Sequence, residues 1–166
     1  MYWELLMAKE KEVKTNAMRI LDKLKIAYKV NFYECDEFID GMHIADKLGQ
    51  SYDSSFKTLV TVGKSKQYYV FALPVDKELD MKKAAKVVGE KSLEMVAVKD
   101  INAVTGYIRG GCTPIGMKKL YKTVIHASAL DFDEIIVSGG KLGTQLQLKP
   151  DDLAKACGAV FEDIIV

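Results

Sequence analysis

Hydrophobic residues recur along the chain at two spacings, one typical of helices and one typical of strands. Apolar positions at helical spacing after Thr15 predict a first helix, which Thr15 is placed to cap. Pro150 is placed at the start of the last helix. Asp80 precedes another helical segment, and Gly49 and Gly89 are placed to end two of them. Further helices are expected at 41–48, 81–88, 101–104 and 151–156. Runs rich in β-branched and aromatic residues predict strands at 28–34, 56–62, 68–73, 93–98, 123–126, 134–138, 144–148 and 160–165.

The order of these elements predicts the fold class. The segment GKSK at 63–66 joins two strong strand patterns and favours a hairpin. Hairpins mixed with scattered helices, without a strict strand-helix-strand alternation, indicate an α+β fold. The length of 166 residues is that of one compact domain, which we place at 15–166 after an extension at 1–14. Met7 is the start that we expect for the natural protein.

The charge balance limits the kinds of partner that the protein can bind. Lys and Arg total 24 against 23 acidic residues, giving a net charge of +1, and only Arg19 and Arg109 are arginines. Such a balance excludes a strongly basic protein that binds nucleic acid by neutralising many phosphates. A local basic patch stays open, formed either by the lysines at 82, 83 and 86 or by those at 118, 119 and 122. A solvated helix face is the alternative for each set.

The cysteines indicate the compartment. Cys35, Cys112 and Cys157 are odd in number and far apart in the sequence. This pattern argues against a disulfide framework or a structural zinc site, and we expect a protein of the reducing cytosol. The longest stretch without a charged residue, 67–75, is about half of the roughly 18 residues that a membrane span needs. We expect no metal, no cofactor and no membrane partner.

Three local features are candidates for chemistry. Lys57 lies inside a predicted core strand, where it is either functional or an edge lysine that discourages aggregation. Gly110 and Gly111 precede Thr113-Pro114 in a stretch whose exposed amides suit a phosphate or carbonyl oxygen. The segment SGGK at 138–141 follows an apolar strand. The alternative for both glycine segments is a structural turn.

Other candidates fit a structural role better. The sequence has no GxGxxG, GxxxxGK[ST] or GxSxG motif. His43 is expected on a helix surface with Asp46 three residues on, and His126 at a buried strand end. Cys112 has no evident base in the sequence, so we expect it to pack.

Four motifs in a fixed order identify a known family. They are FKTLV at 56–60, LDMKKAAK at 79–86, TGYIRGGCTPIG at 105–116 and VSGGKLG at 137–143. In this order they closely resemble the YbaK/EbsC family of Cys-tRNA(Pro) deacylases, relatives of the editing domain of bacterial prolyl-tRNA synthetases. The resemblance covers residues 15–166 and implies a mixed, barrel-like sheet with flanking helices.

The resemblance also implies the roles of individual residues. The essential lysine of the family falls on Lys57, and its pocket tyrosine falls on Tyr33. Gln145 stands where the best-known member has an aspartate, which puts the role of a carboxylate at that corner in doubt. The residues expected to bind substrate are Tyr33, Thr58, Gly110, Gly111, Thr113, Ser138, Gly139 and Gln145.

The function implied is trans-editing, the release of cysteine mischarged onto tRNA(Pro). The substrate's own thiol would attack its ester, with Lys57 and the Gly110-Gly111 loop positioning the acyl-adenosine end. Expected partners are the acceptor end of mischarged tRNA(Pro) and, transiently, prolyl-tRNA synthetase. The alternatives are a deacylase for Ala-tRNA(Pro) or another mischarged tRNA, and a non-catalytic module that binds the tRNA end or the synthetase.

Overall fold

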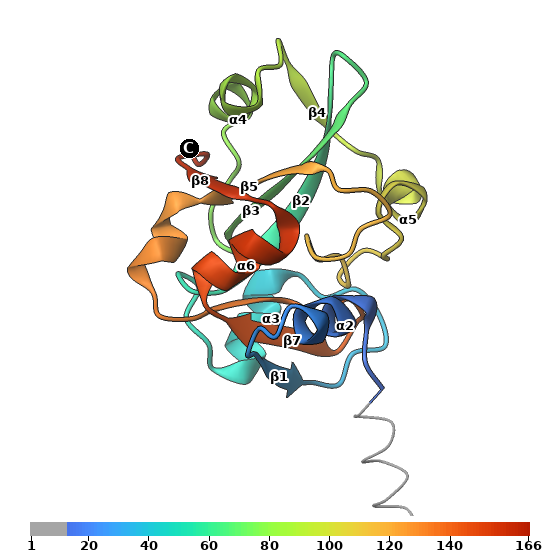
Figure 1. Cartoon of the computed structure of the whole chain (residues 1–166), viewed down its shortest axis with the longest axis vertical. Helices are drawn as coiled ribbons and strands as arrows, with labels where there is room; N and C mark the ends of the chain where they lie inside the picture. The colour runs from blue at the N-terminus through green and yellow to red at the C-terminus, as the bar shows by residue number, and fades with distance from the viewer. Residues whose placement is uncertain (1–12) are drawn as a thin grey trace, which may run out of the picture.

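The computed structural model describes residues 13–166 (Figure 1). Met7, the expected start, and the extension up to residue 12 lie outside the described residues. Strands and helices form two neighbouring groups, with α2, α3, β1 and β7 at one end of the molecule and α4, α5 and β4 at the other. This arrangement confirms the α+β class.

The strands form two sheets. The smaller sheet is antiparallel, in the order β1 (Lys29–Phe32), β7 (Thr144–Leu148) and β6 (Ile135–Ser138). The larger sheet has the order β4 (Leu93–Met95), β2 (Phe56–Gly63), β3 (Tyr68–Pro74), β5 (Lys122–His126) and β8 (Val160–Glu162). It is mixed, because β2 is antiparallel to both of its neighbours whereas β3, β5 and β8 run parallel.

The two sheets meet at a single point and do not close into a barrel. Ser55 forms an isolated parallel bridge with Ile136 of β6, and the Ile136 N–H donates to the Ser54 carbonyl at 2.9 Å. The Val75 N–H donates to the Ser55 carbonyl, which ties β3 to the same point. One bridge cannot continue a ladder, so the barrel-like sheet that the resemblance implied is wrong in this respect.

Local capping sets the ends of the helices. They are α2 (Asn16–Lys23), α3 (Gly41–Leu48), α4 (Met81–Val88), α5 (Ile101–Thr105) and α6 (Pro150–Cys157). The side chains of Thr15, Asp40 and Asp80 each accept a backbone N–H in the first turn of α2, α3 and α4. Gly49 and Gly89 end α3 and α4 in the left-handed conformation.

Three clusters of buried side chains hold the sheets and helices together. One packs α2 and α6 with β6 and β7, and a second packs α4 against β3 and β5. The third joins Val60 of β2 to Val96 and Val104. The strand expected at 93–98 ends at Met95, because the chain turns into a 3-10 helix (Val98–Asp100) two residues later. Between residues 13 and 166, every helix is too short or too polar to cross a membrane.

Candidate active site

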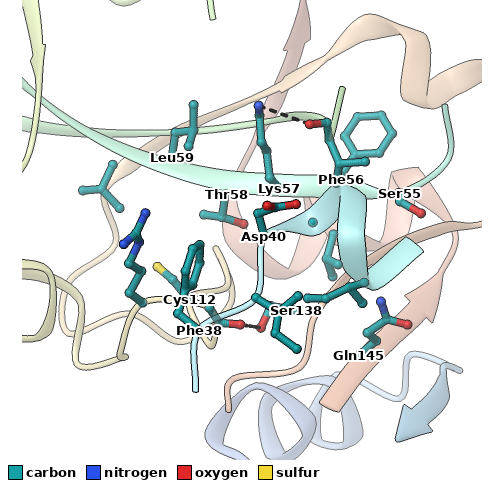
Figure 2. Close-up of a pocket in the computed structure, with 18 of the residues that line it drawn as sticks. Phe38, Asp40, Ser55, Phe56, Lys57, Thr58, Leu59, Cys112, Ser138 and Gln145 are labelled. Atoms are coloured by element: carbon teal, nitrogen blue, oxygen red, sulfur yellow. Dashed lines mark hydrogen bonds between the residues drawn. The ribbon is translucent and has the colours of Figure 1, made fainter. Parts of the chain in front are cut away.

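A pocket of about 380 Å³ opens where the two sheets meet (Figure 2). Its walls come from the start of β2, the end of β6, the N-terminus of α3 and the loop that contains Gly110. β4 pairs with β2 only from Thr61 to Gly63, so the edge of β2 that faces away from β3 has no strand partner from Lys57 to Leu59 in the described chain. The pocket lies along this open edge. Of the residues expected to form the site, Tyr33, Lys57, Thr58, Gly110, Ser138 and Gln145 line it.

Lys57 brings a positive charge to the pocket. Its Nζ donates to the Val75 carbonyl at 3.4 Å, a long hydrogen bond that leaves donor capacity for a ligand. Burial lowers the pKa of Lys57 below its ordinary value, whereas the negative charges of Glu78, Asp76 and Asp40 act to raise it. Lys57 does lie at a strand edge without a described partner, as the hypothesis of a lysine that discourages aggregation required. That edge, however, faces a pocket.

Thr58 carries a polar atom without a partner. Its Oγ1 is buried and makes no hydrogen bond to any described residue, Lys57 included. Figure 2 shows Lys57 and Thr58 projecting in different directions from β2. A buried hydroxyl without a partner costs about 1–3 kcal/mol, a penalty that a bound ligand would relieve.

The two expected glycine amides differ in availability. The Gly111 N–H donates to the Ile108 carbonyl at 2.9 Å, and Gly111 does not line the pocket. A Cβ on Gly111 would lie 2.9 Å from the Lys141 Cα, so the glycine permits two loops to touch. Gly110 lines the pocket, and its N–H has no hydrogen-bond partner in the described part of the chain. Of the two amides, only that of Gly110 therefore stays available to a ligand in the described chain.

Two other expected residues lie outside the pocket. The Gly139 N–H donates to the Thr144 carbonyl at 2.8 Å, which closes the turn between β6 and β7. Thr113 is fully buried, and its hydroxyl has no partner among the described residues. Ser138 does line the pocket, and its hydroxyl donates to the Gly110 carbonyl at 3.4 Å, linking the two glycine loops. The turn between β6 and β7 thus supports the loop that carries Gly110.

The far corner of the pocket is neutral. Gln145 and Gln50 exchange two side-chain hydrogen bonds, at 2.7 and 3.1 Å. Asn31 also points its amide toward Gln145 Oε1, at 3.5 Å. Tyr33 lines the pocket close by, with its N–H donating to the Gly143 carbonyl and with burial raising the pKa of its hydroxyl. This corner of the pocket therefore has a paired amide.

Sequence reasoning missed three residues of the pocket. The Arg109 guanidinium lies 3.8 Å from the ring centroid of Phe38, a cation–π contact in the wall. Phe38 is 41% exposed. Among residues 13–166, Asp40 is the one carboxylate that lines the pocket, and it is held by the N–H and the ring of His43. The signal for Asp40 was its capping position, whereas nothing in the sequence pairs Phe38 with Arg109.

The residues assigned to structural roles keep them. Cys112 packs beside Val60 and Val96, and burial raises the pKa of its thiol to about 11. The His126 ring accepts the Ile164 N–H at a buried strand end. His43 is exposed on α3, although its partner is Asp40 and not Asp46. The structure thus confirms the structural assignment of these three side chains.

The family of the chain follows from its sequence. Residues 42–156 match the model of the aminoacyl-tRNA editing domain, which is more than half of the chain. The chain belongs to this family. The matched part of the editing domain includes Lys57, Gly110 and Gln145, whereas Tyr33 and Phe38 precede it.

Known proteins resemble this editing domain over more than nine-tenths of the chain. A curated protein of Enterococcus faecalis, "Putative Cys-tRNA(Pro)/Cys-tRNA(Cys) deacylase EbsC", is 43% identical over 160 residues, covering 95% of this chain and 98% of its own. A crystal structure described as "a putative trans-editing enzyme for prolyl tRNA synthetase" has a TM-score of 0.78 at 23% identity, covering 93% of this chain and 99% of its own. The crystal structure of a hypothetical protein has a TM-score of 0.84 at 20% identity, covering 92% of this chain and 100% of its own. At these identities the two structures show the shared fold.

Proposed function

We propose that this protein is a trans-editing deacylase that releases cysteine from mischarged tRNA(Pro). The proposal agrees with the name of the relative that is 43% identical. The observation that carries it is a pocket that combines a cation, a free hydroxyl and a free backbone amide, contributed by Lys57, Thr58 and Gly110. These are the groups that hold an ester carbonyl and the charge that develops on it.

The pocket itself supplies no activated nucleophile. Its one thiol, that of Cys112, stays protonated near neutral pH because burial raises its pKa to about 11. Neither described histidine lines the pocket. A thiol in the substrate would fill this role.

The reaction then proceeds through the substrate's own sulfur. The cysteine thiol gives its proton to solvent, and the thiolate attacks the ester carbonyl carbon. The bond from that carbon to the ribose oxygen breaks, the ribose oxygen takes a proton from solvent, and a cyclic thiolactone leaves. Water opens the thiolactone to free cysteine. Discrimination against proline is then chemical, whereas a pocket alone separates such side chains by only about 1–3 kcal/mol.

Each pocket group has a role in this scheme. The Lys57 ammonium and the Gly110 N–H stabilise the oxyanion, and Thr58 donates to the ester or the ribose. The Phe38 ring and the Arg109 plane at the wall offer a stacking surface for the terminal adenine. Tyr33 closes the aminoacyl end of the pocket beside the neutral amide pair.

The protein's partners follow from its charge. With a net charge of +1, the chain is poorly equipped to hold a whole tRNA alone. It acts on the acceptor end, and prolyl-tRNA synthetase supplies the remaining tRNA affinity in a transient complex in the cytosol.

The test is deacylation of tRNA(Pro) charged with cysteine, alanine, serine or proline. We expect cysteine to be released fastest, and Lys57→Ala to lower kcat/KM by about 10²–10³-fold, the usual cost of one oxyanion donor. Circular dichroism of the variant checks that the fold is retained. Faster release of alanine or serine would identify a different deacylase. Binding of aminoacyl-adenosine without turnover would identify a non-catalytic module.

A further inference from the structure

A second groove lies on the larger sheet, away from the pocket. Its walls come from the β2–β3 hairpin and from the segment that leads into β5, with Lys66, Lys119 and Lys122 among the lining residues. No carboxylate lines this groove in the described part of the chain. The three lysines are exposed, and their side chains make no hydrogen bond or ion pair with residues 13–166. Three uncompensated positive charges therefore share one concave surface.

Two aromatic rings form the base of this groove. Tyr68 and Tyr121 meet edge to face, with ring centroids 5.7 Å apart, and the Tyr121 hydroxyl donates to the Val104 carbonyl at 2.6 Å. Parallel pairing of β3 with β5 sets Lys122 opposite Tyr69. These contacts fix the positions of the rings and of the backbone that carries the lysines, so the surface is preorganised.

The groove and the pocket share one packed cluster. Tyr68 and Tyr121 pack against the cluster that contains Val60 and Val96, and both valines line the pocket on its other side. The two concave surfaces thus border the same cluster of packed side chains. A nucleic acid whose 3′ end enters the pocket carries its phosphates over the neighbouring surface within a few nucleotides.

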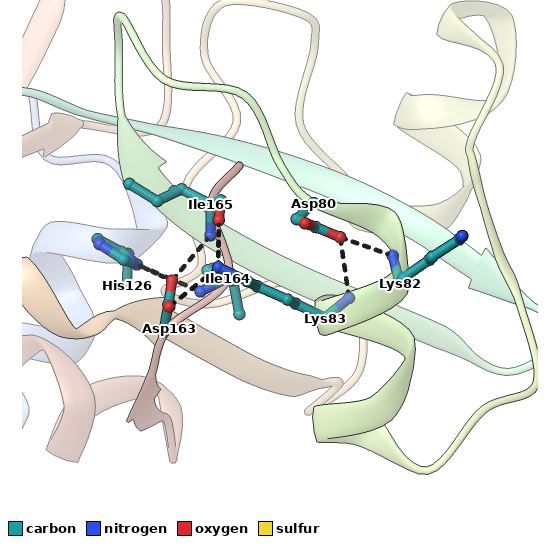
Figure 3. A network of polar contacts seen from close by, with 7 residues as sticks. All are labelled: Asp80, Lys82, Lys83, His126, Asp163, Ile164 and Ile165. Atoms are coloured by element: carbon teal, nitrogen blue, oxygen red, sulfur yellow. Dashed lines mark hydrogen bonds and ion pairs between the residues drawn. The ribbon is translucent and has the colours of Figure 1, made fainter.

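Of the two lysine sets of the sequence, only the set at 118, 119 and 122 contributes to the groove, and each set has one lysine whose side chain is held by the chain, Lys83 and Lys118. On α4, Lys83 donates to the Asp163 carboxylate at 3.0 Å and to the Ile165 carbonyl at 2.9 Å (Figure 3). That side chain is already neutralised. Lys119 and Lys122 of the other set lie in the groove without a partner in the described chain.

We propose that this groove binds the phosphodiester backbone of the acceptor arm of the tRNA substrate. This inference rests on the proposed function. Lysines bind phosphates as point charges, and tyrosines add stacking, so the contact is independent of sequence. A protein partner fits less well, because the cores of protein interfaces are depleted in lysine, and Leu120 is the one strongly exposed apolar side chain of the lining. Glu90 accepts hydrogen bonds from the hydroxyls of Ser65 and Tyr69 and is not part of the lining.

The experiment compares two double variants of the same charge. Lys119→Gln/Lys122→Gln removes two charges from the groove, and Lys82→Gln/Lys86→Gln removes two exposed charges from α4. Each is assayed on Cys-tRNA(Pro) and on cysteinyl-adenosine, which has no phosphate.

We expect the groove variant to lose about 3–10-fold in kcat/KM on the tRNA. The slope of log(kcat/KM) against log salt concentration becomes shallower by about 0.7–0.9 for each lost contact. Activity on cysteinyl-adenosine is unchanged, and the α4 variant matches the native protein on both substrates.

Three outcomes overturn the proposal. The first is equal behaviour of the two variants on tRNA. The second is a loss by the groove variant on cysteinyl-adenosine as well, and the third is a loss that appears only when prolyl-tRNA synthetase is present. If the native protein turns over neither substrate, the proposed deacylase function fails by itself. Fluorescence anisotropy with an uncharged acceptor-stem hairpin then tests the groove, with weaker binding expected for the groove variant and equal binding overturning the proposal.

Discussion

Gln145 and Gln50 exchange two hydrogen bonds across the corner of the pocket, so that each amide acts as both donor and acceptor. Gln50 follows the glycine that ends α3, and Gln145 lies on β7. The pair joins a helix end to the smaller sheet without introducing a charge. A lone carboxylate in place of Gln145 would accept from Gln50 but could not return a donor.

A double-mutant cycle measures this pair. We expect Gln50→Ala and Gln145→Ala each to lower the free energy of unfolding by about 1–2 kcal/mol, because each leaves a part-buried amide without its partner. The double variant costs less than the sum, with a coupling of about 1 kcal/mol. Urea unfolding provides the free energies. Additive losses would show that the pair contributes nothing as a unit.

The pH dependence of deacylation tests the charge on Lys57. Burial lowers the pKa of this lysine below 10.5, so its ammonium loses its proton earlier on the alkaline side than a free lysine does. The enzyme-dependent rate should therefore rise with pH as the substrate thiol ionises. It should then decrease as Lys57 loses its proton, and this decrease should begin at a pH lower than 10.5. Lys57→Arg keeps the charge throughout this range and should abolish the alkaline fall. A native profile without an alkaline limb would contradict a charged Lys57 in the reaction.

Cys112→Ala separates the packing role of this thiol from catalysis. The side chain lines the pocket, but its raised pKa of about 11 makes it a poor nucleophile. We expect kcat within about threefold of the native value and a loss of stability on the order of 1 kcal/mol from the small cavity. Single-turnover kinetics and thermal unfolding measure the two effects. A 100-fold loss of kcat in a folded variant would make the thiol a reacting group.

His126 makes the stability of the protein depend on pH. Figure 3 shows the ring beside Asp163, with Nδ1 accepting the Ile164 N–H at 3.3 Å. Burial lowers the pKa of His126 below 6.5, so below this pH the unfolded chain binds a proton that the folded chain refuses. The free energy of unfolding should fall as the pH drops from 7 to 5. His126→Gln keeps an acceptor for the Ile164 N–H and should flatten that slope. An unchanged slope would assign the effect to other groups.

The sequence by itself determined what depends on neighbours in the chain. Thr15 and Asp80 cap their helices, and Gly49 and Gly89 end them, at the residues that the pattern indicated. Capping is a contact between residues two to four apart, so local sequence contains it. The four ordered motifs likewise contained the family and its lysine. They also singled out Lys57 as a candidate, and the structure shows that this residue lines the pocket.

The tertiary structure alone decided what depends on residues far apart. Glycine spacing marked Gly110 and Gly111 as equivalent amides, but the contact with Lys141 and the bond to Ile108 leave only Gly110 free to bind a ligand. The partner of Gln145 is 95 residues away. The parallel pairing of β5 with β3 and β8 and the open edge of β2 are also long-range features. A chemical motif specifies which groups are present, whereas the packing of distant segments decides which of them stay unpaired and face a substrate.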